Sequence, residues 1–123
     1  MKTVLLVDDE HAIIDALAGI LEDEGFRVVT ASNGREALSR LEEGVPDVAL
    51  VDVMMPGMDG RELVHRMQAD PRFRGVPVVL MSAVPQSILA RDGALGCVDF
   101  FHKPFDLWQL LARLRQLSGM EPG

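Results

Sequence analysis

Four short polar segments of this chain carry side chains of the types that handle phosphate groups. Asp8-Asp9-Glu10 comes first, Asp52 follows an apolar run, Ser82 follows another, and Lys103 precedes Pro104. Carboxylates that lie close together repel one another and raise their pKa values unless a cation compensates them. A hard divalent cation such as Mg²⁺ prefers oxygen ligands and is held by carboxylates together with phosphate oxygens. If the segments meet in space, they form a site for a divalent cation and a phosphoryl group.

An aspartate can also be the nucleophile that accepts a phosphoryl group. The oxygens of the transferred group then need positive charge and hydrogen-bond donors around them, which Lys103 and Ser82 would supply. Taken singly, each residue has a simpler explanation, because acids after a strand are favoured at helix N-termini and lone serines or lysines are ordinary surface residues. Their convergence on one edge of a sheet is what favours the functional interpretation.

Apolar runs alternate with helical patterns along the chain, which predicts an α/β fold. Strands are predicted at 3–7, 26–30, 48–51, 76–81 and 97–101. Helices are predicted between them, with Asn33 and Asp59 as N-caps and Asp106 near the start of the last helix. This alternation favours right-handed crossovers, a parallel sheet and helices on both faces. The four polar segments then lie at the carboxyl ends of strands, where such sheets bind ligands.

Two features of the C-terminal half are less regular. Pro85 and Gly93 interrupt the segment from Ala83 to Leu95, so we expect a short or irregular fourth helix there. Trp108 lies off the leucine stripe of the last helix and is either a surface aromatic or part of a docking face. We expect one domain at 1–118, followed by a short tail at 119–123.

Composition limits the classes of function. Hydrophobic residues make up 48% of the 123 residues, which argues against disorder. The net charge of −7 argues against direct binding of nucleic acid, which needs a basic surface. A single cysteine excludes an internal disulfide, and no apolar stretch approaches the roughly 20 residues of a membrane span. We expect a cytoplasmic protein that does not contact the membrane and is a monomer or weak dimer.

The four segments together resemble the signature of a known family. The stretches 7–10 (VDDE), 52–60 (DVMMPGMDG), 81–83 (MSA) and 100–105 (FFHKPF) are similar in order and spacing to the receiver domains of two-component response regulators. The resemblance covers nearly the whole chain. It implies a doubly wound, five-stranded parallel sheet of flavodoxin-like order 2-1-3-4-5. It also implies a signalling switch that receives a phosphoryl group from a histidine kinase or phosphotransfer protein and acts on a downstream protein or output domain.

The resemblance implies a metal site and a phosphoacceptor. Asp52 would accept the phosphoryl group. Asp9 and Asp52 would bind Mg²⁺ directly together with the backbone carbonyl of Met54, and Asp8 would act mainly through a metal-bound water. The chemistry implied is limited self-phosphorylation and self-dephosphorylation, so we do not expect an enzyme that turns over a substrate.

Further residues take their roles from the same resemblance. Lys103 would contact the phosphoryl group, and Ser82 would turn towards it. Phe100 matches an aromatic position that packs inward on activation, so Ser82 and Phe100 form the expected switch. The Lys103–Pro104 bond matches a peptide bond that is usually cis in the family.

Two departures from the family pattern have consequences. The stretch between Ser82 and Phe100 is slightly short, which affects the fourth helix and the output face built from that helix, the fifth strand and the fifth helix. The residues two positions after Asp52 and Ser82 are Met54 and Val84, whose apolar side chains cannot orient a hydrolytic water. We therefore expect slow self-dephosphorylation.

Three other functions fit parts of the pattern. A receiver-like module could bind partners without phosphorylation. A phosphatase of the haloacid-dehalogenase type also uses an aspartate nucleophile with Mg²⁺, but it carries a second aspartate where this chain has Met54. A flavodoxin-like module needs a phosphate loop rich in glycine, serine and threonine, whereas Asp8-Asp9-Glu10 repels phosphate unless a metal is present.

Overall fold

The computed structural model describes residues 1–89 and 96–119. Five parallel strands form one sheet in the order β2-β1-β3-β4-β5, which confirms the predicted fold. The strands are β1 (Thr3–Val7), β2 (Arg27–Ala31), β3 (Val48–Asp52), β4 (Val78–Ser82) and β5 (Asp99–His102). The helices are α1 (His11–Asp23), α2 (Gly34–Glu43), α3 (Gly60–Ala69), α4 (Gln86–Leu89) and α5 (Leu107–Ser118). None of the described helices has the length and apolar character needed to cross a membrane.

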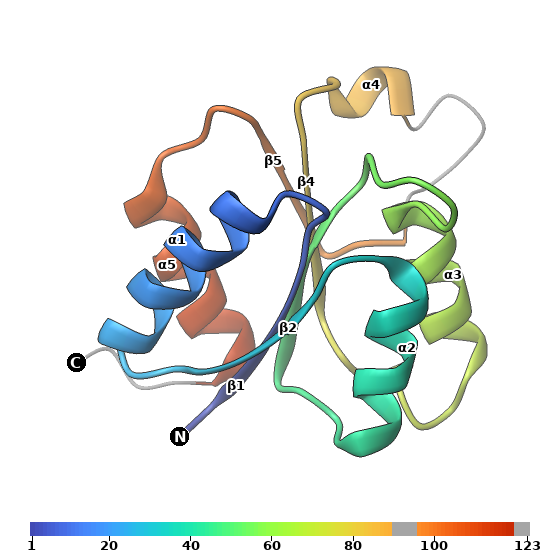
Figure 1. Ribbon diagram of the computed structural model, residues 1–123, viewed down its shortest axis with the longest axis horizontal. Helices are drawn as coiled ribbons and strands as arrows, with labels where there is room; N and C mark the ends of the chain where they lie inside the picture. Colours follow the sequence, from blue (N-terminus) through green and yellow to red (C-terminus); the bar gives the residue numbers. More distant parts are fainter. Residues whose placement is uncertain (90–95, 120–123) are drawn as a thin grey trace.

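The sheet separates two hydrophobic cores. Helices α1 and α5 cover one face, and α2 and α3 cover the other (Figure 1). Successive residues of a strand point to opposite faces, so in β1 Leu5 packs in the core under α2 and α3, whereas Leu6 packs in the core under α1 and α5. This double burial explains why β1 and β3 are continuous apolar runs rather than alternating ones.

Side-chain caps begin three of the helices. The Asn33 carboxamide accepts a hydrogen bond from the backbone N–H of Glu36 at 2.8 Å, at the start of α2. Asp59 accepts from two backbone N–H groups at the start of α3, and Asp106 does the same for α5. Each cap satisfies N–H groups that have no partner within the helix. The predicted N-caps Asn33 and Asp59 are therefore confirmed.

Three strands begin later than the hydrophobic pattern predicted. Phe26 belongs to the end of the α1 turn, because its N–H donates to the carbonyl of Leu21, and β2 begins one residue later. Pro77 precedes β4 rather than lying inside it, and its carbonyl accepts from the N–H of Ala49. β5 begins at Asp99, where pairing with β4 starts, instead of at residue 97. Apolar character marks the buried segment, whereas hydrogen-bond pairing sets the ends of the strand.

The predicted fourth helix is described only in part. Its described part, α4, is a four-residue helix that includes Ile88 and Leu89. The remainder of the segment, residues 90–95, lies outside the described residues, as do residues 120–123 of the predicted tail. Trp108 is 70% exposed, in agreement with its place off the leucine stripe of α5.

Gly60 lets α3 begin directly against the end of β3. Its N–H donates to the carbonyl of Val53 at 2.9 Å. A Cβ atom at this position would lie only 2.6 Å from the backbone oxygen of Asp52 and 2.9 Å from the Cα of Val53. Both atoms belong to the backbone, so no side-chain rotation can relieve the clash. The close approach of α3 to the segment that carries Asp52 therefore requires glycine.

Gly60→Ala is expected to lower the free energy of unfolding by about 1–3 kcal/mol, the usual cost of inserting a methyl group into a closely packed place. Urea unfolding measures this change. Gly19→Ala is the matched control, because Gly19 lies in α1 with open space around its missing Cβ. Alanine there is expected to stabilise the helix by about 0.5–1 kcal/mol. Changes of the same sign in both variants would contradict this account of Gly60.

Candidate functional site

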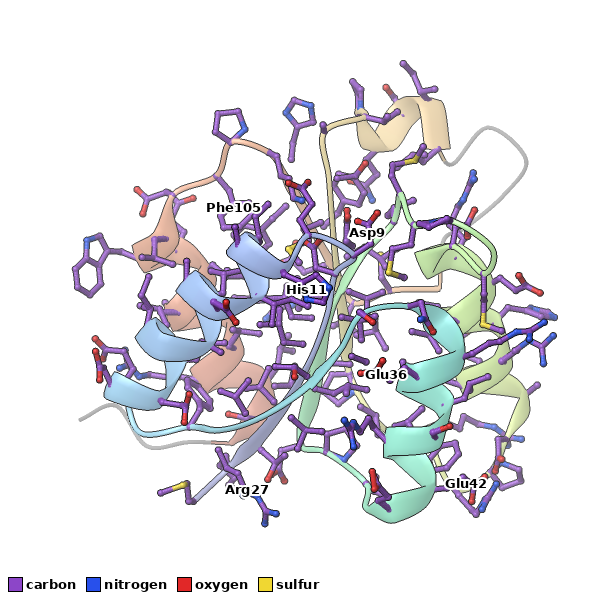
Figure 2. The ribbon with its side chains drawn as sticks, in the orientation of Figure 1. Asp9, His11, Arg27, Glu36, Glu42 and Phe105 are labelled. Carbon is purple, nitrogen blue, oxygen red and sulfur yellow. The ribbon has the colours of Figure 1, made fainter. Side chains whose placement is uncertain are left out.

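Three carboxylates meet at the carboxyl end of the two central strands. Val7 pairs with Val51, so Asp8 and Asp52, which follow them, come out at the same edge of the sheet. Asp9 is in the next position, in the loop between β1 and α1 (Figure 2). Asp8, Asp9 and Asp52 each offer a carboxylate oxygen, and these oxygens lie within 4.8 Å of one another. Asp8 and Asp52 are buried, whereas Asp9 is exposed.

Burial and mutual repulsion act on the Asp52 carboxyl group. Desolvation and the charge of Asp8 raise the pKa of Asp52 to about 6, against the opposing effects of the Lys103 charge and the Met54 N–H. The Lys103 ammonium lies 3.5 Å from an oxygen of Asp8 and 3.7 Å from an oxygen of Asp52. One ammonium among these three carboxylates leaves an excess of negative charge. That excess, together with oxygen-only donors, fits a hard divalent cation.

One backbone contact and one side-chain contact orient the Asp8 carboxylate. One of its oxygens accepts the N–H of Glu10 at 3.0 Å, and the other faces Lys103. Met54 follows β3 by two residues and is 52% exposed. The use of the Met54 carbonyl as a metal ligand stays a prediction.

Ser82 and Lys103 arrive from the two neighbouring strands. Ser82 is the last residue of β4 and is fully buried, and its carbonyl accepts from the Lys103 N–H at 2.8 Å. The Ser82 hydroxyl accepts a hydrogen bond from the N–H of Val84 at 3.0 Å. The Lys103–Pro104 peptide bond is cis, as the resemblance implied. Phe100 is half-buried and packs against the core under α2 and α3.

Sequence reasoning missed one contact beside the site. His102 Nε2 lies 3.0 Å from the carbonyl oxygen of Ala83, in the loop after β4. The signal available in the sequence was the position of a histidine directly before Lys103. Its significance depends on the pairing of His102 with Ser82 in the β4–β5 ladder, which the sequence alone does not specify.

The family model of the response regulator receiver domain matches residues 4–115. The chain belongs to this family. In a receiver domain, the cluster of Asp8, Asp9 and Asp52 fits the phosphoacceptor and Mg²⁺ site. Family membership gives no support to the phosphatase or flavodoxin-like alternatives.

Individual relatives agree with the assignment. The response regulator PleD of Caulobacter vibrioides is 40% identical over 116 residues, which cover 94% of this chain and 26% of PleD. The chain spans about half the length of several other curated response regulators, such as PhoB of Rhizobium meliloti at 52%.

Solved receiver structures match nearly the whole chain. The receiver domain of a histidine kinase from Syntrophus aciditrophicus has a TM-score of 0.89 and 31% identity, with coverage of 100% of this chain and 95% of that one. The response regulator TrrA of Thermotoga maritima, in complex with Mg²⁺ and BeF, has a TM-score of 0.84 and 28% identity, with coverage of 95% and 99%.

Asp52→Asn is expected to stabilise the metal-free protein at pH 7.5. The folded pKa of about 6 exceeds the ~3.9 of an unfolded aspartate. The folded carboxyl group therefore binds its proton more tightly, and the resulting stability is fully present below about pH 4 and is lost as the pH rises through 6. Asparagine avoids this loss, a gain on the order of 1–3 kcal/mol at pH 7.5 that shrinks towards pH 4. Urea unfolding at several pH values measures it.

Asp15→Asn, at an exposed position of α1, is the control and is expected to change stability little at any pH. Adding Mg²⁺ should narrow the difference in free energy of unfolding between wild type and Asp52→Asn. The cation binds the carboxylates of the folded wild type and stabilises that state by mass action. A gain at Asp52→Asn that is equally large at pH 4 and pH 7.5 would show that charge repulsion is not its cause.

Proposed function

We propose that this receiver domain is a switch that accepts a phosphoryl group on Asp52 from a phosphohistidine of a histidine kinase or phosphotransfer protein. The observation that carries the proposal is the cluster of Asp8, Asp9 and Asp52 with the Lys103 ammonium 3.7 Å from an oxygen of Asp52. The cluster supplies a nucleophile, a cation site and a positive charge at one point.

The transfer assigns a task to each side chain. A carboxylate oxygen of Asp52 attacks phosphorus, an O–P bond forms, and the P–N bond breaks with its electron pair returning to the imidazole of the donor. Lys103 pairs with the phosphoryl oxygens, whose negative charge it partly neutralises. The Ser82 hydroxyl donates a hydrogen bond to one of those oxygens once the group is in place. Phe100 then packs further inward, which changes the surface that a partner sees.

We propose Mg²⁺ as the cation. Asp9, Asp52 and the Met54 carbonyl would hold it directly, with Asp8 acting through a bound water. Oxygen-only donors support this choice, as does the presence of Mg²⁺ and BeF in the TrrA structure. When bound, Mg²⁺ neutralises charge on the carboxylates and on the transferring group.

The downstream partner is a protein target or an output domain. A surface that changes when Asp52 is phosphorylated can pass on the signal by contact, so we propose no substrate turnover beyond self-phosphorylation and self-dephosphorylation. The net charge of −7 supports protein contacts over direct nucleic acid binding. We predict a cytoplasmic location, because a kinase that uses ATP would act there. We also predict that the protein is a monomer or weak dimer.

Incubation with Mg²⁺ and acetyl phosphate is expected to add one phosphoryl group to the wild type and none to Asp52→Asn, because only a carboxylate can form the acyl phosphate. Intact mass measures the adduct, and a chelator should abolish it. Beryllofluoride, a phosphoryl mimic, gives a second readout by the increase in melting temperature. A wild type that forms neither adduct nor beryllofluoride complex would leave phosphorylation-independent partner binding as the better hypothesis.

The phosphorylated wild type is expected to persist much longer than seconds without a phosphatase. Met54 and Val84, two residues after Asp52 and Ser82, offer no hydrogen-bonding side chain to orient an attacking water. Met54→Asn provides such a group and should shorten the lifetime several-fold. Loss of the mass adduct with time, after removal of acetyl phosphate, measures both. A lifetime of a few seconds in the wild type would refute this expectation.

A further inference from the structure

His102 ties the end of β5 to the segment that follows β4. Its Nε2 lies 3.0 Å from the carbonyl oxygen of Ala83. A carbonyl oxygen can only accept a hydrogen bond, so in this contact Nε2 carries a hydrogen and is the donor. His102 is also the register partner of Ser82, so the contact lies beside the serine that ends β4. The His102 side chain is exposed, so the contact is separate from the packing of the core.

The same segment holds the Ser82 hydroxyl. Val84 N–H donates to Ser82 Oγ at 3.0 Å. Among the described residues, no hydrogen bond joins Ser82 Oγ to Asp52. The hydroxyl is therefore engaged with the loop after β4 and not with the phosphoacceptor. Residues 83 and 84 are held at two points, one to Ser82 and one to His102.

We propose that His102 is a positioning residue that holds Ala83 and Val84 in their resting place and thereby opposes the turning of Ser82 towards a phosphoryl group on Asp52. This inference rests on the proposed function, because it concerns the regulation of the same site. When Ser82 donates to a phosphoryl oxygen, its hydroxyl leaves the N–H of Val84, and the loop segment shifts with it. The bond from His102 to Ala83 resists that shift and favours the resting state.

The size of the effect follows from one exposed hydrogen bond. A bond of ordinary net strength changes a two-state equilibrium by about three- to tenfold. This is enough to alter the rate of phosphorylation without making it independent of Mg²⁺ or of Asp52. His102 itself is outside the carboxylate cluster, so its removal leaves the cation site intact.

The test compares three single variants. His102→Leu removes the donor at similar size, and His102→Gln offers an amide N–H in place of Nε2. His65→Leu removes an exposed histidine from α3 and is the matched control. The initial rate of phosphoryl gain from acetyl phosphate, read by intact mass at saturating Mg²⁺, is expected to rise three- to tenfold in His102→Leu. His102→Gln and His65→Leu are expected to stay within twofold of the wild type.

A second pair of variants separates positioning from a merely structural effect. Ser82→Ala lacks the hydroxyl that turns towards the phosphoryl group. Adding His102→Leu to Ser82→Ala is therefore expected to leave its phosphorylation rate unchanged. If His102→Leu matches the wild type, or speeds Ser82→Ala as much as it speeds the wild type, the inference is overturned while the proposed function stands. If neither the wild type nor His102→Leu gains a phosphoryl group or binds beryllofluoride, the proposed function fails and the inference fails with it.

Discussion

Asp8 and Asp52 follow paired residues of two neighbouring parallel strands, so the sheet itself holds their carboxylates close together. The pairing of Val7 with Val51 sets the backbone positions of both residues, and both side chains are shielded from water. Their repulsion is therefore built into the fold, and it raises the pKa of Asp52. The ammonium of Lys103 relieves only part of it. A cation that binds between these carboxylates would reduce their repulsion and stabilise the folded protein.

The strands and the loops contribute differently to the site. Asp52 and Ser82 are the last residues of strands, so their backbone positions are fixed by the pairing of β3 with β4. The loop after β4 is held by single hydrogen bonds, one that Val84 N–H donates to Ser82 and one that joins His102 to Ala83. The backbone positions of Asp52 and Ser82 are thus set by strand pairing, while the loop after β4 is secured by individual hydrogen bonds that can exchange. A switch needs both properties, because a site that moved with the loop would lose its ligand geometry.

Much of this arrangement could be predicted from local sequence. The continuous apolar runs at β1 and β3 indicated double burial, and the acids at their ends indicated the site, because the carboxyl ends of parallel strands share an edge. Asn33 and Asp59 were predictable as caps from residue type alone. The starts of β4 and β5 were not, because they depend on which residues pair. The contact of His102 with Ala83 joins residues 19 positions apart and follows from that same pairing. The need for glycine at position 60 appears only when the backbone of Asp52 is placed against it.

The division of the interior into two cores has a consequence for how such a domain can diversify. Leu5 and Leu6 are neighbours in sequence, yet the sheet places them in separate clusters. Substitutions under α1 and α5 therefore share few partners with substitutions under α2 and α3, and their effects on stability should be close to additive. One helical layer can accumulate changes that suit a new partner while the other keeps its packing. The strand ends that carry Asp8, Asp52 and Ser82 lie between the two layers and keep their register. Partner specificity can therefore change while the carboxylate cluster stays the same.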